Sequence, residues 1–320
     1  MKFDEYISVV LPAFNGSEYL RSAIESILKQ TYGKFELIIV NDGSTDDTED
    51  VVKSITDGRI RYFRIEHSGM GKALNYALKN AKYNWIALMD SDDIAHPERF
   101  EIELNYKNLA LNDVLFPDSV YFKGNKIKFL NTISGSIEAI EEKIRLHGHI
   151  CMSGVIFNKD FILSNGGFDE SLGNSEDYDL WMKIIDKANF IHVDIPLMFV
   201  RMRENSMSRD NYKKTKDTLY FIKQKYNLSY PGISAGWNEF FYGSKDKAKY
   251  IFSKYLLNPR ASIGYLICLM PEKMFNYIID YKIIPRFRYL LLKVIFLRKY
   301  MKIQNVLSGL IQSSSKQGIS

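Results

Sequence analysis

Apolar and polar positions alternate along the first ninety residues in blocks of two kinds. Continuous apolar runs of strand length occur at 7–11 (ISVVL) and 36–40 (ELIIV), and each ends in a polar, turn-forming stretch. The segments 17–30 and 70–79 instead place apolar residues on one face at helical spacing. Continuously apolar strands are typical of parallel sheets that are covered on both faces. The pattern therefore predicts repeated β-α units.

The same reading extends along the chain. Further strands are expected at 59–65, 85–89, 114–123 and 151–157, and a helix at 136–146. After about residue 210 the pattern is largely helical. We therefore expect an α/β fold with a mostly parallel, Rossmann-like sheet and helices on both faces, formed by residues 1–210, and a C-terminal helical region at 211–320.

Polar residues in the turns predict where two helices begin. Ser17 offers a side-chain oxygen that can cap the helix at 17–30. Ser44 or Thr45 can cap the helix after the second strand, and Asp46 and its neighbour suit the positive end of that helix.

Composition narrows the class of protein. With 320 residues, 46% hydrophobic and 25% charged, the chain can bury a sizeable core and is neither disordered nor collagen-like. Its first residues, MKFDEYISVVLPAFN, lack the basic and long apolar regions of a secretory signal, so we expect a cytoplasmic protein. Cys151 and Cys268 lie far apart in sequence, and we expect two buried free thiols.

The net charge of +5 is unevenly spread. From Arg260 to Ser320 there are ten Lys or Arg residues and two acidic residues, so this tail carries +8 and the remainder carries −3. The tail mixes these charges with aliphatic residues in KIIPRFRYLLLKVIFLRKYMK, whose apolar runs are too short to span a bilayer. We expect peripheral attachment to the inner face of the cell membrane rather than nucleic-acid binding. The alternative is ordinary helices packed on the first domain.

Three acidic residues, Asp90, Asp92 and Asp93, follow the apolar strand at 85–89. Clustered carboxylates repel one another, and burial makes this worse, so a positive charge is expected among them. Asp90 and Asp92 have the spacing and oxygen chemistry to ligate Mg²⁺ or Mn²⁺ beside a diphosphate. The alternative is that Asp92 or Asp93 caps a helix that begins near Pro97.

Two more polar stretches lie at carboxyl ends of predicted strands, where ligands bind in parallel α/β sheets. They are Pro12 to Asn15 and Asn41 to Gly43. Asp42 can accept a hydrogen bond from the imide N–H of a base, and Phe14 can pack on a base or ribose. The stretch after Asn41, taken alone, is better explained as an ordinary turn with an Asx cap, but three such clusters would converge on one rim.

Five segments, in this order, resemble the inverting family 2 glycosyltransferases, which have the GT-A fold. They are VVLPAFNGSEYLRSAIESILKQTY, FELIIVNDGSTDDT, GMGKALNYALKNAKYNWIALMDSDD, GGFDE and SEDYDLWMKI. The resemblance covers roughly residues 6 to 210 and implies a nucleotide-sugar donor, usually a UDP-sugar, and a divalent metal, Mn²⁺ or Mg²⁺.

The resemblance also assigns residues to the donor site. Pro12, Phe14 and Asp42 fall at the uridine-binding positions, and Asp90 and Asp92 fall on the D-x-D metal and diphosphate site. The full set of expected donor-binding residues is Pro12, Phe14, Asn15, Asp42, Lys72, Asn75, Asp90, Ser91, Asp92 and Arg203.

By the same resemblance Asp177 is the catalytic aspartate and Glu176 its acidic neighbour. A base of this kind must reach the acceptor hydroxyl from the face opposite the leaving diphosphate. The alternative is that both acids merely favour a helix N-terminus. Asp179 is expected to be a solvated charge and Trp181 a core residue.

Gly166 and Gly167 in GGFDE match the loop that frames the acceptor in the family, and Asp169 is expected to help position it. The family often has Arg-x-His after its final strand, where the His completes the metal site. Here Arg203 takes that position. A guanidinium cannot ligate a metal but can bind phosphate, so Arg203 or Arg201 is expected to share the charge-neutralising role.

These features predict the inverting transfer of one sugar from a nucleotide sugar to a hydroxyl of a growing surface glycan or a lipid-linked oligosaccharide. The Q-x-x-R-W pattern of processive synthases is absent from the sequence, so one sugar is expected per encounter. Two alternatives share some of the features: a metal-dependent nucleotidyltransferase, which would release pyrophosphate, and a non-catalytic partner in glycan assembly.

Overall fold

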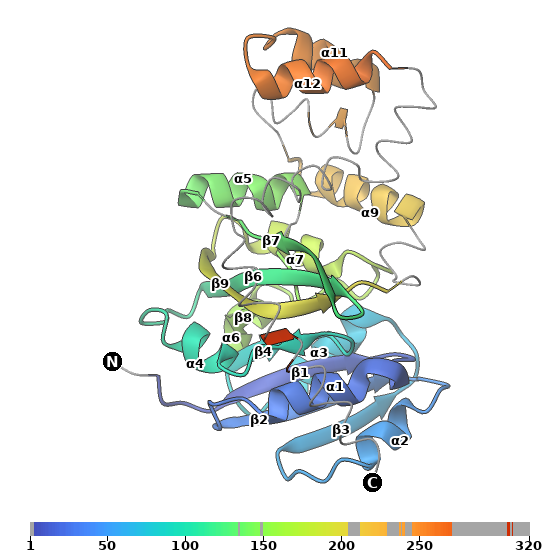
Figure 1. Cartoon of the computed structure of the whole chain (residues 1–320), viewed down its shortest axis with the longest axis vertical. Helices are drawn as coiled ribbons and strands as arrows, with labels where there is room; N and C mark the ends of the chain where they lie inside the picture. The colour runs from blue at the N-terminus through green and yellow to red at the C-terminus, as the bar shows by residue number, and fades with distance from the viewer. Residues whose placement is uncertain are drawn as a thin grey trace.

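The computed structural model describes residues 3–133, 135–147, 150–203, 212–228, 237, 239–240, 245–270, 306–307 and 309. In these residues one sheet runs in the order β3-β2-β1-β4-β8-β6-β9-β5, and β7 pairs with β6 (Figure 1). The strands are β1 (Ile7–Ala13), β2 (Phe35–Asp42), β3 (Ile60–Ile65), β4 (Trp85–Leu88), β5 (Ile94–Ala95), β6 (Asp113–Lys123), β7 (Lys126–Asn131), β8 (Ile156–Asn158) and β9 (Asn189–Arg201).

Helices connect these strands and follow them. They are α1 (Ser17–Leu28), α2 (Thr48–Lys53), α3 (Met70–Asn80), α4 (Arg99–Leu104), α5 (Ile137–His147), α6 (Lys159–Ser164), α7 (Glu176–Ile184), α9 (Tyr212–Lys225), α11 (Lys245–Ser253) and α12 (Pro259–Cys268). The expected mostly parallel α/β sheet is confirmed: β1 pairs in parallel with β2 and β4, β2 with β3, and β6 with β9. Strand β8 runs antiparallel to both β4 and β6, so the sheet is mixed at its centre.

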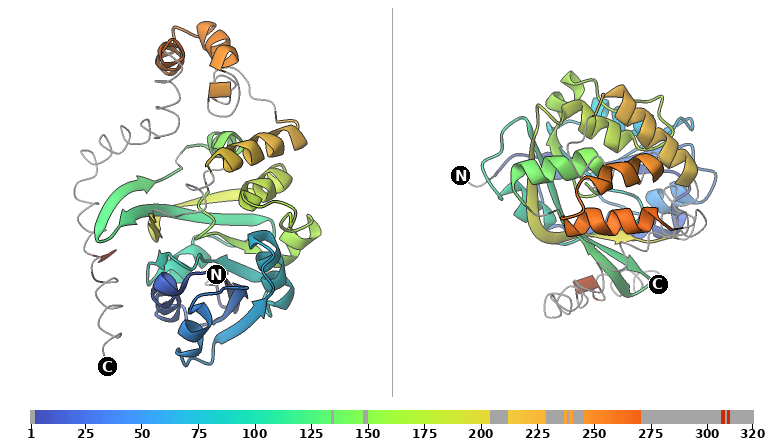
Figure 2. Two further views of the ribbon diagram at one scale, coloured as in Figure 1. Left: turned by 90° about the vertical axis from the view of Figure 1, so that its right-hand side faces the viewer. Right: turned by 90° about the horizontal axis from the view of Figure 1, so that it is seen from above.

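Alternation along the central strands explains their continuous apolar runs. Val9 and Leu11 of β1 pack in a core with α1 and α4, whereas Val10 packs in a second core with α3, α6 and α7. Figure 2 shows these helices on opposite faces of the sheet. Since both faces are covered, each residue of the strand is buried, and its one polar side chain, Ser8, donates a hydrogen bond to Glu36 of β2 at 2.7 Å.

The predicted caps were wrong. Helix α1 begins at Ser17 without a side-chain cap, and the Ser17 N–H donates to an Asp46 oxygen at 3.0 Å. The other Asp46 oxygen accepts from the Thr48 N–H at 3.1 Å, so α2 begins after Ser44 and Thr45. One carboxylate therefore serves the positive ends of two helices, which lowers the pKa of Asp46.

The strand predicted at 151–157 is also shorter than expected. Only Ile156–Asn158 pairs as β8, because Gly154 takes a φ of +120° and bends the chain before it. Ser153 in this bend accepts a hydrogen bond from the Asp90 N–H at 3.1 Å. The bend therefore supports the loop that follows β4.

Beyond β9, helix α9 packs against α7, and Ile222 is fully buried in the core on that face of the sheet. Packing thus continues past the domain boundary predicted at residue 210. Helices α11 and α12 share a separate small core around Phe240, Phe252 and Cys268. Both cysteines are free thiols as predicted, Cys268 buried and Cys151 half-buried.

In the described part of the chain, no helix has the length and apolarity of a membrane span. The basic and aliphatic segment KIIPRFRYLLLKVIFLRKYMK, expected to attach to a membrane, lies outside the described residues.

Candidate active site

The carboxyl ends of β1, β2 and β4 meet at one edge of the sheet, as the sequence predicted. Asn15, just after β1, donates its N–H to the Ser44 hydroxyl at 2.9 Å and accepts from the Thr45 N–H at 2.8 Å. A methyl group at Gly16 would lie 3.1 Å from the Ser91 hydroxyl, so the turn after β4 closes against the same place. Pro12, in β1, pairs with Val40 of β2.

Asp42 lies at the end of β2 with its carboxylate turned toward residues 67 to 69. One oxygen accepts from the Ser68 N–H at 2.8 Å, and the other from the Gly69 N–H at 2.9 Å and the His67 ring at 2.9 Å. The side chain is 4% exposed. Its oxygens therefore anchor the turn that leads into α3. A nucleobase at this place would contact residues 67 to 69 as well as the carboxylate.

His67 belongs to this site but was missed by the sequence reasoning. Its ring stacks on Phe14, with centroids 4.1 Å apart and planes 16° apart. Both residues are exposed, the His67 side chain to 58% and Phe14 to 43%. The position of EHSG immediately before α3 is the one signal in the sequence that could have identified it. Together the two rings offer a flat aromatic surface at the rim.

The acidic cluster after β4 is compact. Ligand oxygens of Asp90, Asp92 and Asp93 all lie within 4.8 Å of one another. Burial, then the charges of Asp92 and Asp177, raise the pKa of Asp90 to about 7. Three hard oxygen donors at this spacing fit Mg²⁺ or Mn²⁺, and Asp93 joins the two residues expected. The alternative helix cap is wrong, because β5 follows directly and α4 begins only at Arg99 without a side-chain cap.

Two arginines from the end of β9 lie among these acids. The Arg203 Nε is 2.6 Å from an Asp92 carboxylate oxygen. Arg201 donates its N–H to Asp93 and its Nε–H to the Asp92 carbonyl, both at 2.9 Å, and its guanidinium lies over the rings of Tyr19 and Phe122. Part of the positive charge expected among the acids is therefore supplied by the chain.

Glu176 and Asp177 form the first turn of α7, directly after Ser175, whose φ is +60°. A left-handed conformation costs a residue other than glycine about 1 kcal/mol or more, so the surrounding structure holds this turn in place. Burial raises the pKa of Asp177 to about 6. Burial, then the charges of Asp177 and Asp90, raise the pKa of Glu176 to about 7. These two acids and the cluster after β4 are thus within electrostatic range of each other.

Asp179 and Trp181, further along α7, are both fully buried. Trp181 is a core residue, as predicted, and packs edge-on against Phe190. The prediction of a solvated charge at Asp179 was wrong, because Lys225, Lys183 and Tyr226 surround its carboxylate.

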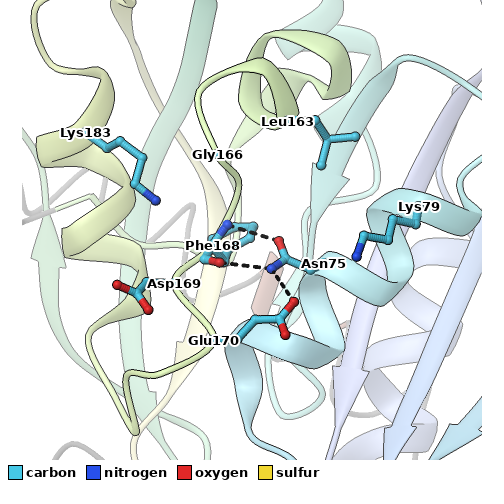
Figure 3. A pocket seen from close by; sticks show the side chains of 8 residues that line it. All are labelled: Asn75, Lys79, Leu163, Gly166, Phe168, Asp169, Glu170 and Lys183. Carbon is cyan, nitrogen blue, oxygen red and sulfur yellow. Dashed lines mark hydrogen bonds between the residues drawn. The ribbon is translucent and has the colours of Figure 1, made fainter.

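Gly166 and Gly167 lead into Asp169 in the loop between α6 and α7. This loop and α3 line an open cavity of about 550 Å³ (Figure 3). The cavity is lined by Asn75, Lys79, Leu163, Gly166, Phe168, Asp169, Glu170 and Lys183. Two of the three residues expected at the acceptor, Gly166 and Asp169, therefore line this cavity, and Gly167 lies between them in the chain.

The expected donor contacts of Asn75 and Lys72 stay predictions. The Asn75 amide donates to the Phe168 carbonyl and to Glu170, both at 2.9 Å, and accepts from the Phe168 N–H at 3.0 Å. Both of its N–H groups thus bind the loop that contains Phe168 and Glu170. Lys72 is exposed on the first turn of α3.

Comparison with known proteins gives the same picture. A family model described as Glycosyl transferase family 2 matches residues 8–151. The O-antigen biosynthesis glycosyltransferase WbnJ of Escherichia coli is 33% identical over 205 residues, covering 59% of this chain and 76% of WbnJ. WfaP of Escherichia coli, a UDP-Glc:alpha-D-GlcNAc-diphosphoundecaprenol beta-1,3-glucosyltransferase, is 28% identical over 254 residues, covering 78% of this chain and 97% of WfaP.

Other relatives are longer. The chain spans 32% of the length of an uncharacterized glycosyltransferase of Rickettsia felis, with 35% identity over 202 residues, or 59% of this chain. Among solved structures, residues 1–349 of TarS from S. aureus with UDP-GlcNAc have a similar fold, with a TM-score of 0.57 and 20% identity. The match covers 84% of this chain and 82% of that one.

The fold resemblance to TarS confirms the GT-A architecture, and the match to WbnJ extends over most of that enzyme's length. The chain therefore belongs to glycosyltransferase family 2.

Proposed function

We propose that the chain transfers a single sugar from a UDP-sugar, with inversion at the anomeric carbon, to a hydroxyl of a growing surface glycan or a lipid-linked oligosaccharide. The observation that carries this proposal is the pairing of two acidic groups across one site. Asp90 to Asp93 end β4, Glu176 and Asp177 begin α7, and the charge of Asp177 raises the pKa of Asp90.

Asp177 is the proposed general base. With a pKa of about 6 it is ionised at neutral pH and yet more basic than an ordinary aspartate. It would take the proton from the acceptor hydroxyl as the oxygen attacks the anomeric carbon from the side opposite the diphosphate. Attack from that side inverts the configuration, and the bond to the diphosphate oxygen breaks as the new bond forms.

The departing nucleotide gains negative charge. The acidic cluster after β4 would offset this charge through a bound cation. Asp90, Asp92 and Asp93 would hold a divalent cation, which when bound supplies positive charge beside the diphosphate. Arg203 is close enough to share that role, because its guanidinium already contacts Asp92. The aromatic surface of Phe14 and His67 is the proposed binding site of the donor's nucleobase.

The relatives support the donor and the acceptor class. WfaP is named for a UDP-Glc donor and a diphosphoundecaprenol-linked sugar acceptor, WbnJ for O-antigen biosynthesis, and the TarS structure holds UDP-GlcNAc. An acceptor attached to a lipid would place the enzyme at the inner face of the cell membrane. The +8 tail is the part of the sequence suited to an anionic leaflet.

A panel of UDP- and GDP-sugars, screened by saturation-transfer NMR with and without Mn²⁺, tests the donor. We expect a UDP-sugar to give the strongest signals. The products of a reaction with lipid-linked or glycan acceptors then test the chemistry. Release of UDP supports the proposal, together with an anomeric coupling constant showing that the product has the opposite configuration to the donor. Release of pyrophosphate, or retention of configuration, would overturn it.

A further inference from the structure

One lysine joins the acceptor loop to the catalytic helix. The Lys225 Nζ, at the end of α9, lies 2.9 Å from an Asp169 oxygen and 2.8 Å from an Asp179 oxygen. Asp169 belongs to the loop after α6, and Asp179 lies one turn after Glu176 in α7. A residue far along the chain thus bridges the two parts that would have to receive the acceptor.

Asp179 is the centre of this arrangement. It is fully buried, and the Tyr226 hydroxyl donates to the same oxygen at 3.0 Å. Its second oxygen is 3.4 Å from the Lys183 Nζ, which also donates to the Gly167 carbonyl at 2.7 Å. One buried carboxylate therefore orients two lysines, each of which holds a different point of the same loop.

The other side of the loop is held by α3 without an ion pair. A methyl group at Gly71 would lie 2.9 Å from the Asp169 carbonyl oxygen, and Asn75 makes three hydrogen bonds to Phe168 and Glu170. The loop is thus fixed by hydrogen bonds to the Asn75 side chain on the α3 side and by ion pairs on the α9 side. Figure 3 shows the labelled side chains of this wall around the cavity.

We propose that Lys225 is a positioning residue for the acceptor: by pairing with Asp169 and Asp179 it sets the distance between the acceptor loop and the turn that carries Asp177. The acceptor part of this inference rests on the proposed function, whereas the fixing of the loop does not. The acceptor class is the same glycan or lipid-linked sugar, which would meet the wall formed by Gly166 to Asp169.

An ordinary exposed ion pair would be a weak basis for such a role, since it stabilises a protein by only about 0–1 kcal/mol. Lys225 differs because one of its two partners is fully buried, and a buried carboxylate is costly when its partners are removed. The pKa of Asp169 is well below its usual range because of hydrogen bonds from Ser171 and Lys225, so the pair stays ionised at neutral pH.

The test is hydrogen–deuterium exchange of the full chain, compared for wild type, Lys225→Met and Lys225→Arg. We expect Lys225→Met to speed exchange in the loop at 166–172 by about fivefold to tenfold, and Lys225→Arg to restore it largely. Lys29→Met is the matched control, because it removes a lysine whose 3.2 Å ion pair with Glu25 lies in α1. It should leave the loop unchanged.

Two further measurements separate positioning from loss of structure. Affinity for UDP with Mn²⁺, measured by calorimetry, should stay within about twofold of wild type in Lys225→Met, because the donor rim does not involve α9. In the transfer assay the same variant should raise the KM for the acceptor about fivefold or more and change that for the donor by less than about twofold.

The outcomes are distinct. The proposal is overturned if exchange in the loop is unchanged in Lys225→Met, or if Lys225→Arg exchanges as fast as Lys225→Met. This holds even if sugar transfer is confirmed. Faster exchange together with an unchanged acceptor KM overturns the acceptor role. Failure of any UDP-sugar to bind to wild type would instead overturn the proposed function and leave the loop result standing.

Discussion

The guanidinium of Arg203 lies 2.6 Å from the carboxylate of Asp92, at the place where the family often has a histidine. An arginine at this point neutralises part of the acidic cluster, but it cannot ligate a metal. A divalent cation would therefore bind beside the positive charge of Arg203, which already pairs with Asp92, one of the cation's expected ligands. Metal binding should be weaker than in a site completed by a neutral imidazole.

Changing Arg203→His should strengthen Mn²⁺ binding by about tenfold, because the substitution removes a competing cation and adds a nitrogen ligand. Titration of free Mn²⁺ followed by electron paramagnetic resonance measures this. Arg203→Gln is the control, since it removes the charge without adding a ligand, and it should give a smaller gain. Equal or weaker binding in the His variant would show that Arg203 does not compete with the metal.

Asp177→Asn should reduce sugar transfer by about 100-fold to 10,000-fold, the usual contribution of a positioned general base. UDP affinity should be nearly unchanged, because the base faces the acceptor. Calorimetry and a UDP-release assay measure the two quantities. Asp186→Asn is the control, because it makes the same change just after the end of α7. The Asp186 side chain is 79% exposed and pairs with Arg145. Full turnover by the Asp177 variant would require a different base.

The same substitution should stabilise the fold at high pH. Folding raises the pKa of Asp177 from 3.8 to about 6, so the folded state binds more protons between these values and loses stability as pH rises through them. Above pH 6 the whole cost of burying the charge is present. Asp177→Asn removes this cost, and the variant should gain up to about 3 kcal/mol of stability at pH 8 and little below pH 4.

Urea unfolding without added divalent cations, at pH 8 and pH 4, measures this difference. A gain of equal size at both pH values would mean that the Asn side chain stabilises the turn for a reason unrelated to charge.

Gly167→Ala should destabilise the protein by about 1–3 kcal/mol. Gly167 has a φ of +62°, and an added methyl group would lie 2.8 Å from the Asn75 oxygen that accepts from the loop. Gly33→Ala is the matched control, because nothing lies within 4 Å of its added methyl and its backbone is not left-handed. Thermal unfolding of both variants checks the prediction, which an equal effect at the two positions would contradict.

Reversing the charge of the tail should release the protein from anionic vesicles. Replacing Lys293, Arg298 and Lys299 by Glu removes basic residues, each of which contributes roughly 1 kcal/mol at a negative surface. Cosedimentation with vesicles containing about one third phosphatidylserine measures binding. Binding that is equally strong in the variant, or absent in wild type, would reject membrane attachment through the tail.

The fold was largely predictable because its pattern is local. The apolar runs of β1, β2 and β4 are buried on both faces, so their period and length identify them without further context. The short β5 and the hairpin strand β7 were not predicted, because two residues carry no period and β7 depends on pairing with β6. The helix caps were predicted wrongly because Asp46 accepts hydrogen bonds from the first turns of two helices, and no local sequence rule describes such a contact.

The candidate site divides in the same way. Asp90 and Asp92 could be found because their spacing after a buried strand is local, whereas Asp177 was indicated by the family resemblance alone. The surroundings of Asp179 could not be anticipated, since its lysine partner from α9 lies 46 residues away. Likewise, nothing in the sequence near Asn75 indicates that its amide serves a loop 93 residues later.

The rim formed by β1, β2 and β4 comes from the first 95 residues, whereas the wall from Gly166 to Asp169 comes from a later segment that meets the rim through α3. The two segments are not independent, because Gly71 and Asn75 of α3 are fitted to the later loop. A chimera that takes the later segment from a relative would therefore have to carry α9 along and keep the loop residues that meet α3.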